Sequence, residues 1–97
     1  MKVALKELLL KLLGDRIEHK VVEITATATS GMHSWTVPIG LPSTAKILSI
    51  TIMRLPNPNW IYADIANYDT NNVVISYNNT YSGNITETLQ LSILYRL

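Results

Sequence analysis

The sequence has no cysteine, little charge and no long uninterrupted apolar run. The lack of cysteine excludes disulfides, thiolate catalysis and zinc sites with cysteine ligands. Charged residues make up 15% of the chain, the net charge is +1, and no basic run is interleaved with aromatic residues. We therefore expect no nucleic-acid partner. No segment approaches the roughly 18 apolar residues of a membrane-spanning helix, which predicts a soluble protein with no membrane partner.

The residues of common catalytic sites are also scarce. His19 and His33 are the only histidines, and neither has an Asp, Glu or His at metal-ligand spacing. Asp64 and Asp69 are close in sequence, but one belongs to a strand pattern and the other to a turn pattern. We expect no enzyme activity, no cofactor and no metal. One alternative stays open, in which three copies of His19 or His33 meet at a threefold axis and bind a metal ion.

Residues 1–13, MKVALKELLLKLL, contain neither glycine nor proline and are rich in leucine. This composition predicts a helix that ends at Gly14. Its apolar surface runs most of the way round, so one partner surface cannot cover it. Since so short a helix is marginal in water, we expect packing on at least two sides.

The two sides of this helix predict two neighbours. We expect Leu8 and Leu12 to face a symmetry-related copy, and Leu9 and Leu13 to face the following domain of the same chain. The predicted oligomerisation residues are Leu5, Leu8, Leu9 and Leu12.

After Gly14 the apolar period changes from three or four residues to two, which is typical of strands. The chain is predicted to be mainly β. Residues 1–14 form an oligomerisation helix, and residues 15–97 form an antiparallel β-sandwich or jelly-roll-like domain of about six strands. The expected strands are residues 19–29, 34–39, 45–55, 60–68, 73–77 and 85–97.

Two of these strands allow a prediction of their place in a sheet. Pro38 confines residues 34–39 to an edge or a strand end, because proline cannot donate to the ladder. Residues 45–55 alternate Ile47, Ser49, Thr51 and Met53 against Leu48, Ile50 and Ile52, with β-branched apolar side chains on both faces. That pattern predicts a central strand.

The predicted loops combine aromatic and amide side chains, which are the groups that sugar rings require. The alternative is that asparagine serves left-handed turn geometry and that Trp60 belongs to the core. Asn79 and Asn84 lie in the same loops. The candidate surface-binding residues are Asn57, Asn59, Trp60, Asn78 and Tyr81.

Three stretches carry a family resemblance: MKVALKELLLKLL, WTVPIGLP and ITETLQLSILYRL. They resemble small virion proteins of tailed phages and prophages, in which a short N-terminal helix precedes a compact β domain similar to the head or tip domains of tail fibres and receptor-binding proteins. The resemblance implies a homotrimer with a coiled-coil stem, located on a virion. It also implies contacts with other virion proteins and with a host cell-surface glycan.

The sequence therefore favours a non-enzymatic phage-type structural protein that acts in virion assembly and host-surface attachment. The alternative is a small bacterial carbohydrate-binding or adhesion module. A virion protein is expected to be an obligate oligomer through residues 1–13, whereas a carbohydrate-binding module is expected to be a monomer with one aromatic platform.

Overall fold

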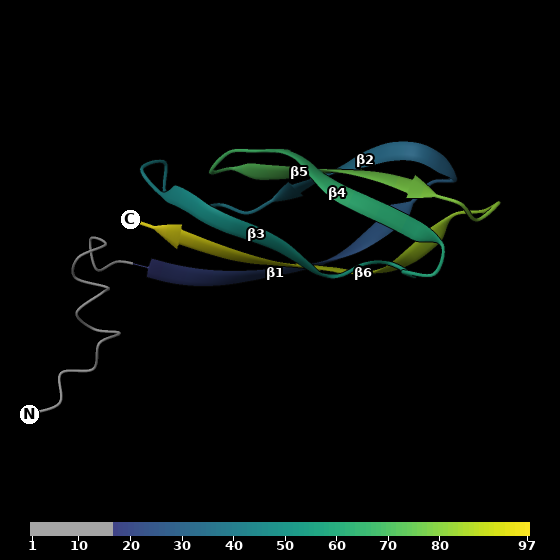
Figure 1. Ribbon diagram of the computed structural model, residues 1–97, viewed down its shortest axis with the longest axis horizontal. Helices are drawn as coiled ribbons and strands as arrows, with labels where there is room; N and C mark the ends of the chain where they lie inside the picture. The colour runs from purple at the N-terminus through teal and green to yellow at the C-terminus, as the bar shows by residue number, and fades with distance from the viewer. Residues whose placement is uncertain (1–16) are drawn as a thin grey trace, which may run out of the picture.

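The computed structural model describes residues 17–97, which form two three-stranded antiparallel sheets packed face to face (Figure 1). Sheet A has the strand order β1-β6-β3, and sheet B has the order β2-β5-β4. The prediction of an antiparallel β-sandwich with six strands is thereby confirmed. The strands are β1 (Ile17–Ala28), β2 (Gly31–Pro38), β3 (Lys46–Arg54), β4 (Ile61–Tyr68), β5 (Asn72–Asn79) and β6 (Ile85–Arg96).

The core lies between the two central strands, β6 and β5. Leu89, Leu91 and Ile93 of β6 are fully buried, while the residues between them face outward. Val73 and Ile75 of β5 are buried opposite them. A period of two thus places one apolar face of each sheet against the other, which is the main source of stability in such a sandwich.

The side of the sandwich formed by β1 and β2 is closed at one end by the segment that follows β2. Ile39 and Leu41 are buried, and their backbone N–H groups donate to the carbonyls of Asn71 and Thr70, both at 2.8 Å. The ammonium group of Lys20, on β1, donates to the carbonyl of Ile39 at 2.6 Å. The Lys20 bond links β1 of sheet A to the segment that follows β2 of sheet B, and the two backbone bonds link that segment to the turn between β4 and β5.

The prediction that residues 45–55 form a central strand is wrong. β3 is an edge strand that pairs only with β6 within the described residues 17–97. Its register shifts at Leu48, so that Ile47, Ile50 and Ile52 all pack toward the core instead of alternating as expected. The prediction for β2 is confirmed, since the strand containing Pro38 lies at the edge of sheet B.

The chain changes sheets at every connection between the described strands except one, the turn that joins β4 to β5. In that turn the Asp69 carboxylate accepts the backbone N–H groups of Asn71 and Asn72, both at 2.8 Å. This is the side-chain hydrogen bonding that favours aspartate in turns.

Some predictions fall outside the described residues. The helix at residues 1–14 belongs to this group, as do the oligomerisation residues Leu5, Leu8, Leu9 and Leu12. From residue 17 onward, the structure contains no helix long and apolar enough to span a membrane.

Candidate functional site

An exposed aromatic pair lies at the end of the sandwich where β4 begins and β5 ends. The rings of Trp60 and Tyr81 pack edge to face, with centroids 5.6 Å apart. Trp60 is 45% exposed and Tyr81 is 44% exposed, so both residues remain accessible to solvent. The structure therefore brings together two of the five residues that the sequence singled out.

The backbone holds this pair in place. The carbonyl of Trp60 accepts both the backbone N–H of Thr80, at 2.9 Å, and the Thr80 hydroxyl, at 2.7 Å. The hydroxyl of Ser30 donates to the carbonyl of Tyr81 at 2.6 Å. A Cβ at Gly83 would lie 3.2 Å from the Tyr81 ring, so this ring packs closely over the glycine. The two rings are exposed but their backbones are fixed.

Asn79 is the residue that organises the loop carrying Tyr81. Its side chain is 2% exposed, and its amide group donates to the carbonyls of Ala28 and Gly83, both at 3.0 Å. The side-chain oxygen accepts the backbone N–H of Tyr81 at 2.9 Å. The sequence placed Asn79 among the loop amides with binding character, and that assignment is wrong because the side chain is buried and its groups are paired inside the protein.

The outer face of sheet B carries a further exposed aromatic side chain, that of Tyr62, two residues after Trp60. Tyr62 and Met32 are exposed and flank Asn78, because Met32 pairs with Asn78 and Asn78 pairs with Tyr62. The next row contains Asp64 opposite Ser76. These residues, together with Ala63 and Tyr77, line a shallow hollow of about 230 Å³. We use the name aromatic surface for Trp60, Tyr62, Asn78 and Tyr81.

The other predicted surface residues take different places. Asn57 adopts a positive φ of 37°, and its carbonyl accepts the backbone N–H groups of Trp60 and Ile61. Asn57 therefore serves the left-handed turn geometry that was the alternative to a binding role. Asn59 is exposed beside Trp60. Tyr62 was visible in the sequence as part of an aromatic strand face, but only the strand pairing shows that it lies next to Asn78.

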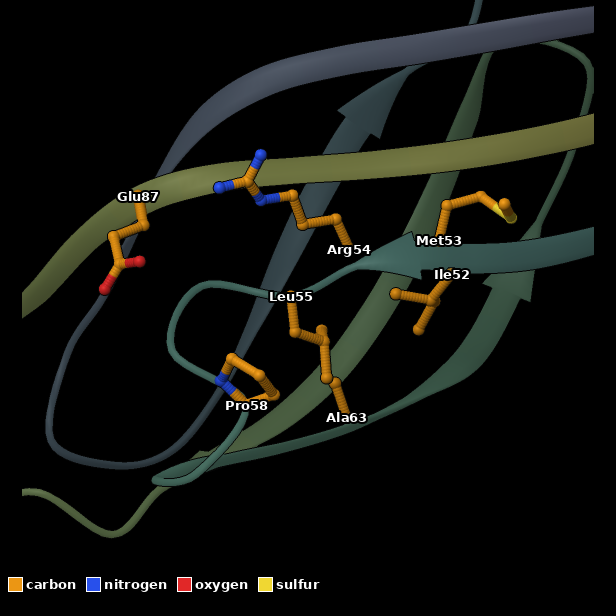
Figure 2. Close-up of a pocket in the computed structure, with 7 residues that line it drawn as sticks. All are labelled: Ile52, Met53, Arg54, Leu55, Pro58, Ala63 and Glu87. Carbon is orange, nitrogen blue, oxygen red and sulfur yellow. The ribbon is translucent and has the colours of Figure 1, made fainter.

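A second concave feature lies between β3 and β4 (Figure 2). The side chains of Ile52, Leu55 and Ala63 point toward one another there, and Pro58 lies beside them. The feature has a volume of about 620 Å³, and we call it the β3–β4 groove. Its lining residues are Ile52, Met53, Arg54, Leu55, Pro58, Ala63 and Glu87.

The two histidines lie on different sheets and in different settings. His19, on β1, shares a hydrogen bond of 2.6 Å with the hydroxyl of Ser92, and the His33 ring, on β2, lies 3.0 Å from the carbonyl of Ser30. Within residues 17–97, no three His, Asp or Glu side chains are grouped so that they could hold a metal ion.

Comparison of the chain with protein-family models, with curated proteins and with solved structures found no match.

Proposed function

We propose that this chain is a non-enzymatic structural protein of the phage-virion type, which assembles as a homotrimer through residues 1–13 and contacts a host-surface glycan. The aromatic surface is the observation that carries this proposal. Its rings offer apolar faces on which the C–H groups of a sugar can pack, and the amide of Asn78 offers hydrogen bonds to sugar hydroxyls.

The rigidity of this surface adds support. Thr80 and Ser30 donate hydrogen bonds to the carbonyls of Trp60 and Tyr81, and the side-chain oxygen of Asn79 accepts the N–H of Tyr81, so binding would order little additional chain. A preorganised platform of this kind suits contact with the C–H face of a sugar ring. It also explains why two large aromatic side chains remain exposed where burial would stabilise the fold.

The strand order supports the jelly-roll-like description. The chain passes from one sheet to the other at all connections between the described strands but the β4–β5 turn, and residues 17–97 hold two strands fewer than the usual eight of a jelly roll. Jelly rolls occur in viral capsid domains and in lectins, which is consistent with both functions considered for this chain. A shared fold does not by itself imply a shared function, so the proposed function depends on the residues of the aromatic surface.

The second candidate function is a small bacterial carbohydrate-binding or adhesion module. The same aromatic surface favours it, because glycan binding needs no virion. The two candidates differ in oligomeric state. Light scattering of the full chain is expected to give three times the chain mass of 10.9 kDa for the virion protein, whereas a monomer mass favours the module. A variant lacking residues 1–13 is expected to lose the trimer.

A binding assay tests the role of the aromatic surface itself. Immobilised bacterial lipopolysaccharides and capsular polysaccharides are probed with the full chain, with Trp60→Ala and with Tyr68→Ala. Tyr68 is a matched control because it is also an exposed aromatic residue, and it ends β4 whereas Trp60 immediately precedes that strand. Binding that falls at least tenfold with Trp60→Ala and stays within twofold with Tyr68→Ala supports the proposal. Equal binding by all three proteins contradicts it.

A further inference from the structure

The edge formed by β3 and β4 is less covered than the interior of the sandwich. Ile50, Ile52 and Leu55 pack against the core, yet each remains half-buried, and so does Ile65 on β4. β3 and β4 are edges of different sheets, and no described strand lies beyond either of them. The row of half-buried aliphatic side chains therefore lies open along one side of the molecule.

The β3–β4 groove lies at this open edge. Ile52 and Leu55 reach it from the β3 side, and Ala63 reaches it from β4 (Figure 2). Arg54 and Glu87 lie toward one end, and Met53 points to the opposite side of β3. The floor is thus aliphatic and the charged groups lie at the margin, which is the composition of a site for an apolar helix face or peptide.

The chain carries a segment of matching character before its first strand. Residues 1–13 contain six leucines, a valine and an N-terminal methionine, and the sequence predicts a helix for them. A helix of this length spans about 20 Å at 1.5 Å per residue. The β3 edge from Ile47 to Leu55 spans about 26 Å at roughly 3.3 Å per residue. The segment therefore fits along the edge without overhanging it.

The position of β1 brings residues 1–13 to the end of the β3 edge at which β3 begins. Ile17 pairs with Arg96, and Arg96 also pairs with Lys46, the first residue of β3. In sheet A, β1 and β3 are two strand spacings apart, which is about 10 Å. The four steps from Leu13 to Ile17 reach up to about 14 Å. Leu13 can therefore lie at the start of the β3 edge, with Met1 directed toward Leu55.

We propose that residues 1–13 pack as a helix into the β3–β4 groove and along the β3 edge of their own chain. Leu9 and Leu13 face the half-buried aliphatic side chains, and Leu8 and Leu12 face away from the sandwich, where a second copy can contact them. The packed helix would cover the half-buried aliphatic side chains of the β3–β4 edge and so complete the hydrophobic core. The proposal does not depend on glycan binding or on a virion location.

The absence of cysteine from the sequence allows a direct test by cross-linking. A double variant with Leu5→Cys and Ala63→Cys carries its only two thiols on the segment and in the groove. A second double variant pairs Leu5→Cys with Pro58→Cys, an exposed groove position that leaves the core unchanged. The control pairs Leu5→Cys with Thr25→Cys, which is exposed on the outer face of β1. Each is treated with a short bis-maleimide and run on a denaturing gel.

The expected result is a cross-link within one chain for both groove pairs, at a yield at least fivefold above that of the control. Cross-links between chains in the groove pairs would overturn the proposal, because they would place the segment of a second copy in the groove. Equal yields in groove and control pairs would also overturn it. Neither result bears on the polysaccharide assay, so a failure here is distinguishable from a failure of the proposed function.

Discussion

Two tryptophan–tyrosine pairs occur in this small domain, and they lie in opposite environments. Trp35 and Tyr77 stack with ring centroids 4.1 Å apart and are 8% and 5% exposed. Trp60 and Tyr81 pack edge to face, and nearly half of each is exposed. The same residue types therefore contribute to the core in one place and to an open surface in the other.

Polar atoms account for much of the difference. The indole N–H of Trp35 donates to the carbonyl of Thr27 at 2.9 Å, and the hydroxyl of Tyr77 accepts the backbone N–H of Thr29 at 3.0 Å. These bonds allow both aromatic residues to be buried without leaving a polar group unpaired. The exposed pair is held by bonds to its backbone instead, and both residues stay nearly half exposed.

The largest expected effect is at the buried pair. Trp35→Ala removes a buried indole and its stacking on Tyr77, which should lower the free energy of unfolding by about 3 to 5 kcal/mol. Urea denaturation followed by circular dichroism measures this change. The matched variant Trp60→Ala should lose less than about 1 kcal/mol, because the side chain is half exposed. Similar losses in the two variants would contradict the distinction between the pairs.

An intermediate effect is expected at Asn79, which lies between the two pairs. Asn79→Ala removes three hydrogen bonds and leaves the carbonyl of Ala28 and the N–H of Tyr81 without this partner, at a cost of about 1 to 3 kcal/mol. Polysaccharide binding should fall as well, because Tyr81 loses its support. Asn84→Ala, at an exposed position of the same loop, is the control and should change neither property. A variant at Asn79 with normal stability would refute its organising role.

The smallest effect on stability is expected from Tyr77→Phe. The substitution keeps the stacked ring and removes only the hydroxyl that accepts the N–H of Thr29, so the loss should be about 1 kcal/mol. Tyr68→Phe, at an exposed position, serves as the control and should be neutral. An unchanged melting temperature in Tyr77→Phe would mean that the buried hydroxyl contributes nothing to the core pair.

Local sequence signals predicted the strands well. Alternation located all six strands, Pro38 predicted the edge position of β2, and the polar cluster at Asp69 predicted the β4–β5 turn. The position of β3 in its sheet was mispredicted. Whether a strand lies at the edge or the centre of a sheet depends on which strands pair, and those strands are far apart in sequence. The bulge at Leu48 also breaks the simple alternation of faces along β3, because it places Ile47 on the same face as Ile50.

The candidate site was predicted only in part. Aromatic and amide residues in loops pointed to Trp60, Tyr81 and Asn78, but spacing along the chain could not show that the two rings meet across the β3–β4 and β5–β6 connections. It also could not separate Asn78, which lies on the outer face, from its neighbour Asn79, which is buried. That distinction depends on strand register, which moves each successive residue to the opposite face.

The most direct test of the central claim uses the fluorescence of the only two tryptophans in the chain. Iodide should quench Trp60 and spare the buried Trp35, and Trp60→Phe should abolish the quenching. If the aromatic surface binds glycan, adding a bacterial polysaccharide that the chain retains in the binding assay will protect Trp60 and lower the quenched fraction at least twofold. Unchanged iodide quenching of Trp60 in the presence of the bound polysaccharide would contradict the account.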